Sequence, residues 1–127
     1  MNDEMKTSVE DFKRFIYGFK RWQVKLGLTD TACVFRHQYV EGAFAGIRYD
    51  QTARLAVVMF STHIPQRDAD YYDPCRTSRH EALELLLARF AAIARSRYCF
   101  PDDISEESHA IIRRLEQAFD SASEEQE

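Results

Sequence analysis

The sequence predicts an α+β fold with an N-terminal helix, a small three-stranded sheet of antiparallel type and two C-terminal helices. Apolar residues recur at helical spacing near both ends of the chain, and segments rich in strand-forming residues lie between them. The 127 residues, with only four glycines and three prolines, suit a single folded domain. We expect this domain over residues 9–119, with a flexible N-terminus at 1–8 and a disordered acidic tail at 120–127.

The first helix is indicated by capping residues and by an aromatic stripe. Thr7 with Glu10, and Ser8 with Asp11, have the spacing of capping pairs ahead of an apolar run. Basic residues take the opposite face of the run, as in an amphipathic helix that packs on a core. The stripe consists of Phe12, Phe15, Ile16, Phe19, Trp22 and Leu26.

Three strand-like segments follow, at residues 32–37, 44–49 and 55–60. A polar turn at 50–52 predicts that the last two form a hairpin. The segment Leu55–Phe60 is apolar on both faces, so we expect it to be the central strand and to be covered by the helices.

The rest of the chain predicts a long loop and two helices. Residues 61–77 form the loop, a length that is often functional. The second helix is expected from near Ser78 to about Phe100, where Pro101 follows. The third is expected from the capping residues at Asp102 through Phe119.

Charge and composition exclude several classes of protein. The 17 basic and 21 acidic residues give a net charge of -4, which disfavours nonspecific nucleic-acid binding. The longest apolar run, Leu55–Phe60, is too short to cross a bilayer, and the first residues do not form a signal peptide, so we expect a cytoplasmic protein with no membrane segment. Three cysteines without Cys-x-x-Cys spacing indicate reduced thiols.

A basic surface in the C-terminal half is an alternative binding feature. Six acidic residues lie in the same span and leave it nearly neutral, so a solvated helix face explains the basic residues as well as nucleic-acid contact does. The basic residues are Arg76, Arg79, Arg89, Arg95, Arg97, Arg113 and Arg114.

The residues with the clearest chemistry stand near the start of the second helix. His80 and Glu84 are four positions apart, so one turn of helix brings them to the same face, where they can hold one metal ion. Glu81 then has the place of a general base that activates water. Zinc hydrolases with this pattern have histidine at the position of Glu84, so zinc affinity and the acidity of bound water should both be lower here.

Structural explanations of the same residues stay open. Ser78 and Glu81 have the spacing of a capping box, and Glu84 lies near Arg89 in sequence, as on an ordinary solvated face. The isolated His37 and His63 are expected to be structural.

The loop after the third strand contains the adjacent tyrosines Tyr71 and Tyr72. These side chains suit an oxyanion donor beside the helix or an interface contact. His63 lies in the same loop. This loop leads to the helix of His80, so it is placed to cover the cleft beside that helix.

Four segments of the chain are informative when taken in order, namely residues 22–28, 55–60, 80–87 and 111–116. In this order they resemble the small metallopeptidase-like proteins of phages and prophages, which are minimal relatives of the His-Glu-x-x-His zincins. The resemblance covers roughly residues 9–119. It implies a zincin-like core in which a three-stranded sheet packs on the metal-site helix, with zinc as the metal and a peptide as substrate.

The resemblance also implies roles for individual residues. His80 matches the first zinc ligand and Glu81 the carboxylate that activates water, while Glu84 stands in place of the second histidine. The third ligand is expected from the last helix, where Glu107 lies at the edge of the apolar stripe and His109 is the other candidate.

Two functions are therefore expected. The first is a phage- or prophage-type zinc metallopeptidase-like protein whose metal site is degenerate. The alternative is a small acidic, non-catalytic binding or inhibitor protein of a mobile element that engages a host or phage protein. The two differ in whether metal is bound, and the sequence indicates neither the partner nor the oligomeric state.

Overall fold

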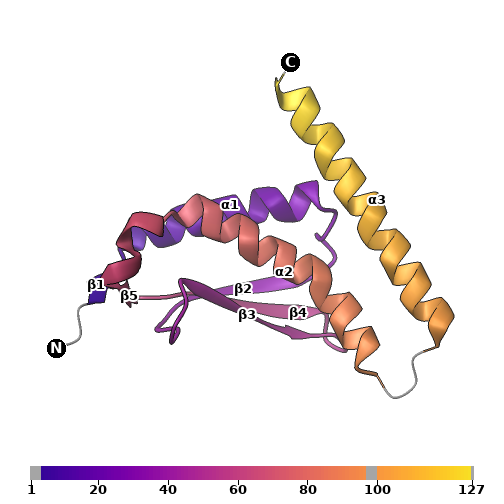
Figure 1. The fold of residues 1–127 in the computed structure, drawn as a ribbon, viewed down its shortest axis with the longest axis horizontal. Coiled ribbons are helices and arrows are strands. Elements are labelled where there is room, and N and C mark those ends of the chain that lie inside the picture. The colour runs from indigo at the N-terminus through magenta and orange to yellow at the C-terminus, as the bar shows by residue number, and fades with distance from the viewer. Residues whose placement is uncertain (1–3, 97–99, 127) are drawn as a thin grey trace.

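The computed structural model describes residues 4–96 and 100–126, with side chains as far as Asp120, and confirms the α+β class. Helices α1 and α2 lie over a small sheet, α3 lies to one side, and a short 3-10 helix, η1, precedes α2 (Figure 1). The order along the chain is β1 (Glu4–Lys6), α1 (Val9–Lys25), β2 (Ala32–His37), β3 (Ala45–Asp50), β4 (Leu55–Phe60), β5 (His63–Pro65), η1 (Gln66–Tyr71), α2 (Pro74–Ala94) and α3 (Pro101–Gln126).

The main sheet has the strand order β2-β4-β3, so the central position of β4 and its hairpin with β3 are confirmed. The sheet is mixed, however, and the expected antiparallel type is wrong for one pair: β2 runs parallel to β4. The reason is that β4 inserts between the two strands that precede it. Val57 of β4 therefore pairs with Val34 on one side and with Arg48 on the other.

Helices α1 and α2 lie side by side on one face of this sheet (Figure 1). The core forms there, where β4 meets the aromatic stripe of α1. The opposite face is open, since Val34, Arg36 and Arg48 are exposed. The prediction that helices cover β4 thus holds for one face only. The core side chains from α1 and β4 are Phe15, Phe19, Ala56, Val58 and Phe60, each with no exposed surface.

Helix α2 begins one turn earlier than expected, at Pro74, after the N-cap residue Asp73. The Asp73 carboxylate accepts hydrogen bonds from the amides of Cys75 and Arg76, at 3.0 and 3.4 Å. Ser78 therefore lies inside the helix, where its hydroxyl donates to the Cys75 carbonyl at 2.7 Å. The capping-box explanation of Glu81 is wrong, because the helix end that it would cap lies elsewhere.

Close packing fixes the position of α2 against α1. Ser78 is completely buried where the two helices cross, and Gly18 of α1 faces it. A Cβ atom at Gly18 would collide with Ser78 Oγ, so only glycine allows this approach.

The N-terminal segment and the expected loop both contain regular structure. Strand β1 pairs with β5 in antiparallel register, within the segment 1–8 that the sequence predicts to be flexible, and residues 1–3 lie outside the described residues. Thr7 strengthens this junction because its hydroxyl donates to the Ser61 carbonyl at 2.7 Å and lies 2.8 Å from His37 Nε2. Strand β5, η1 and the start of α2 occupy most of the span that the sequence assigns to a loop.

Helix α3 packs across the ends of α1 and α2 and extends beyond them (Figure 1). The Asp103 carboxylate caps it by accepting from the Phe100 amide at 2.9 Å. The helix continues to Gln126, through most of the segment 120–127 that the sequence predicts to be a disordered tail, and Glu127 lies outside the described residues. No helix in the ranges 4–96 and 100–126 combines the length and apolar character needed to cross a membrane.

Candidate metal centre

The structure brings His80, Glu81 and Glu84 together on one side of α2. Each offers one potential ligand atom, and these atoms all lie within 4.8 Å of one another. His80 Nε2 is 3.3 Å from Glu84 Oε1, as expected for side chains one helical turn apart. Among the described residues, this is the one group of three or more such side chains that could hold a metal ion.

Glu81 is the unusual member of this group. Only 4% of the residue is exposed, and its Oε2 atom is buried with no hydrogen-bond partner among the described residues. Burial, and then the nearby charge of Glu84, raise the pKa of Glu81 from 4.5 to about 8. Such a carboxyl group keeps its proton at neutral pH unless a cation is brought next to it.

The other two members of the group lie nearer to solvent. The side chains of His80 and Glu84 are 69% and 49% exposed. Glu84 occupies the angular position between the other two on the helix, so a single ion can approach all three from the solvent side. An imidazole nitrogen with carboxylate oxygens is a donor set that zinc accepts and that harder divalent ions such as manganese also accept.

The group opens into a cleft of about 600 Å³. Helix α2 forms one wall, η1 forms another, and the chain that enters β3 forms a third. The volume lies within the range of ordinary ligand pockets. The lining residues are Gly42, Ala43, Phe44, Ala45, Pro65, Asp68, Tyr71, Arg76, Thr77, His80, Glu81 and Glu84.

The adjacent residues Tyr71 and Tyr72 point to different parts of the molecule. Tyr71 lines the cleft and is 71% exposed. Tyr72 turns towards α1, where its hydroxyl donates to Asp11 at 2.7 Å, and burial raises its pKa. Tyr71 is thus the tyrosine that is placed to contact a bound molecule.

The two isolated histidines lie outside the cleft. His37 stacks on Phe12 with ring centroids 4.9 Å apart, and burial lowers its pKa. His63 lies on β5, with Nδ1 3.0 Å from the Thr62 hydroxyl. Their contacts support the structural explanation of both residues.

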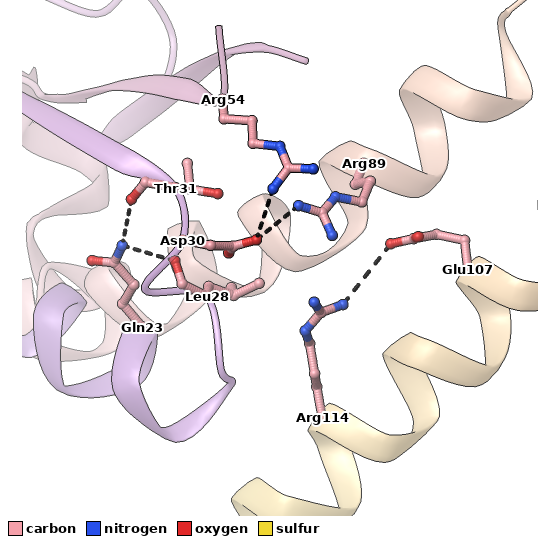
Figure 2. A network of polar contacts seen from close by, with 8 residues as sticks. All are labelled: Gln23, Leu28, Asp30, Thr31, Arg54, Arg89, Glu107 and Arg114. Carbon is pink, nitrogen blue, oxygen red and sulfur yellow. Dashed lines mark hydrogen bonds and ion pairs between the residues drawn. The ribbon is translucent and has the colours of Figure 1, made fainter. Parts of the chain in front are cut away.

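The expected third ligand is not placed at the group. Glu107 of α3 points towards Arg114 of the same helix, with Oε1 3.9 Å from Nη1 (Figure 2). It lines a separate small hollow with Leu85 and Arg89, because α3 docks against a different face of α2. His109 is exposed on α3 and lines neither hollow.

Asp68 and Arg76 also line the cleft, and the sequence did not indicate them as cleft residues. Arg76 stands one helical turn before His80, so it shares that face of α2. The dipeptide Asp73-Pro74 is a strong helix-start signal, and reading it would have placed Arg76 inside the helix. Asp68 carried no such signal, since it depends on η1 folding over the cleft.

The two cysteines that the structure describes take no part in the group. Cys33 is half-buried and Cys75 exposed, both as free thiols, and burial raises the pKa of Cys33. Cys99 and Arg97 lie outside the described residues.

Comparison of the chain with protein-family models, curated proteins and solved structures finds no match.

Proposed function

We propose that this protein is a zinc metallopeptidase-like hydrolase of phage or prophage type with a degenerate metal site. His80 and Glu84 bind the ion, and Glu81 is the general base. One observation carries the proposal: a buried carboxyl group, whose Oε2 atom has no hydrogen-bond partner among the described residues, meets an imidazole and a second carboxylate at the wall of a cleft. An anionic group in that position is stabilised by a cation that the protein chain itself does not supply.

The residues of the site suit peptide hydrolysis. A bound zinc ion would polarise the substrate carbonyl and make water more acidic. Glu81 loses its proton when a cation lies beside it, and it can then accept a proton from water and return it to the leaving amine. Tyr71 lies at the rim of the cleft, where its hydroxyl can donate to the oxyanion.

Zinc titration of the purified protein tests the metal site. The wild type is expected to bind one zinc ion, and His80→Ala to bind it at least roughly tenfold more weakly, because an imidazole ligand is lost. His109→Ala is the matched control, since His109 is also exposed on a helix but lies outside the cleft. Equal affinities for all three proteins, or no zinc binding by the wild type, would contradict the proposal.

Glu81→Gln tests the catalytic role separately from metal binding. This variant keeps the shape of the side chain but cannot accept a proton, so the zinc-loaded protein should lose peptide hydrolysis and keep most of its zinc affinity. A variant that loses zinc affinity instead identifies Glu81 as a ligand and removes the proposed base.

The second candidate is a non-catalytic binding protein that engages a host or phage protein. The observation that favours it is the incomplete ligand set, since α3 brings neither Glu107 nor His109 to the group. The exposed Tyr71 at the cleft is a residue type favoured at protein interfaces. Zinc-loaded wild type that hydrolyses no peptide in a broad library would support this function over the first.

A further inference from the structure

A second hollow adjoins the cleft on the N-terminal side of the metal centre. It has a volume of about 410 Å³ and lies between α1 and the first turns of α2. Arg76 lines both hollows, so they meet at this side chain. We call this second hollow the arginine pocket. Its lining residues are Trp22, Asp73, Cys75, Arg76 and Arg79.

The arginine pocket carries positive charge that the protein does not neutralise. Arg76 and Arg79 are exposed, and neither guanidinium has an ion-pair partner in the described part of the chain. The one acidic residue of the pocket, Asp73, is occupied as the N-cap of α2. Two unpaired guanidinium groups over a hollow are well suited to bind carboxylates, which they hold through paired hydrogen bonds.

Trp22 gives the pocket an aromatic wall. The ring is half-buried and lines the pocket together with Arg76 and Arg79. The methylene groups of a glutamate side chain can pack on such a ring while the carboxylate reaches the arginines. The pocket thus combines the two features that an acidic side chain requires.

We propose that the arginine pocket binds an acidic residue of a peptide whose neighbouring part lies in the cleft, so that the substrates of this protein are acidic peptides. The peptide character of the ligand rests on the proposed function, whereas the preference for carboxylates rests on the pocket. Arg76 precedes His80 by one turn, about 6 Å along the helix axis. That length corresponds to roughly two residues of extended peptide, which sets the expected distance between the acidic residue and the carbonyl at the metal centre.

The charges of the cleft favour a peptide over a polyanion. Asp68, Glu81 and Glu84 line the cleft directly beyond Arg76. A nucleic-acid strand would bring phosphates against these carboxyl groups, whereas a peptide can place a carboxylate in the arginine pocket and neutral backbone in the cleft.

The intrinsic fluorescence of Trp22 reports on the pocket directly, because it is the single tryptophan of the chain. The probes are an end-blocked hexapeptide with two central glutamates and its counterpart with two glutamines, both titrated with a metal chelator present. We expect a saturable fluorescence change with the glutamate peptide and at least roughly tenfold weaker binding of the glutamine peptide. Isothermal calorimetry of the protein with each peptide shows whether a titration without a fluorescence change means that the peptide does not bind.

Variants locate the binding. Replacing Arg76 and Arg79 together by glutamine should weaken binding of the glutamate peptide at least roughly tenfold, whereas Arg113→Gln, an exposed arginine of α3, should bind like the wild type. The chelator keeps metal away from the centre in every titration, so failure of the metal site and failure of the arginine pocket give different results.

Three outcomes would overturn the inference. They are equal binding of the two peptides, wild-type binding by the double variant, and tighter binding of inorganic phosphate or an oligonucleotide than of the glutamate peptide. Circular dichroism of the double variant establishes that a loss of binding is not a loss of folding.

Discussion

Two clusters of charged side chains lie on α2, and they differ in whether their charges are balanced. On the face towards β3 and α3, Arg89 Nη2 lies 3.1 Å from Asp30, whose carboxylate also pairs with Arg54 at 3.6 Å (Figure 2). Nearer the N-terminus of α2, Glu81 is buried next to Glu84 with no arginine or lysine at its carboxyl group. The paired cluster holds elements together, whereas the unbalanced one leaves a carboxyl group that folding alone does not satisfy.

Glu81→Gln should give the largest change in stability, because it removes a buried carboxyl group whose ionised form has no cationic partner among the described residues. The folded-state pKa of about 8 lies above the ordinary 4.5, so the protonated form stabilises the wild type at low pH, and this stabilisation is lost as the pH rises from 4.5 through 8. Urea unfolding should show the wild type losing on the order of 3 kcal/mol between about pH 5 and about pH 9 relative to Glu81→Gln.

Glu116→Gln is the control for this prediction, since Glu116 is exposed on α3. Its dependence on pH should follow that of the wild type. Parallel curves for wild type and Glu81→Gln would show that Glu81 is not buried as described.

Gly18→Ala tests whether the position of α2 against α1 sets up the cleft. The added methyl group meets Ser78, and the overpacking should destabilise the protein by about 2 kcal/mol in thermal or urea unfolding. Part of the loss should be recovered in the Gly18→Ala/Ser78→Ala double variant. The matched control is Gly46→Ala, where the new Cβ would meet Met59 and Val40 at an ordinary 3.6 Å.

Glu84→His tests whether positions 80 and 84 of the unbalanced cluster converge on one metal ion. It restores the His-x-x-x-His pair of zinc hydrolases and should raise zinc affinity roughly tenfold in a competition titration. Unchanged or weaker binding would show that positions 80 and 84 do not converge on one ion. His109→Ala is again the control, since His109 lies on α3 outside the cleft.

Arg89→Met should have the smallest effect, about 1 kcal/mol of lost stability, because Asp30 is partly exposed and retains Arg54. If the loss comes from the ion pair, the same change in an Asp30→Asn background should have clearly less effect. A loss that is equal in both backgrounds would assign it to packing of the Arg89 side chain alone.

Much of the fold was predictable because it depends on local patterns. The aromatic stripe of α1 and the two-faced apolar character of β4 correctly indicated the core helix and the central strand. The parallel pairing of β2 with β4 was not predictable in this way, since it arises from the insertion of β4 between earlier strands. The start of α2 was misplaced because Ser78 offered a plausible cap, whereas the Asp73-Pro74 pair determines the helix start.

The candidate site was predictable only as far as one helix extends. His80, Glu81 and Glu84 share a face because helical periodicity requires it. The third ligand depended on where α3 docks, which is a tertiary property: contacts with Leu85 and Arg89 place Glu107 away from the group. Asp68 and Tyr71 reach the cleft for the same kind of reason, through the fold of η1.

The pairing of β1 with β5 makes one wall of the cleft depend on a distant stretch of chain. Each of the two strands has three residues, and η1 follows β5 directly. Pairing of these distant segments closes a long loop, which costs conformational entropy, and only a few hydrogen bonds offset that cost. The β1–β5 ladder is therefore expected to open more readily than the core strands. Fraying of this ladder would loosen η1, which carries Asp68 and Tyr71, without disturbing the face of α2 that carries His80 and Glu84.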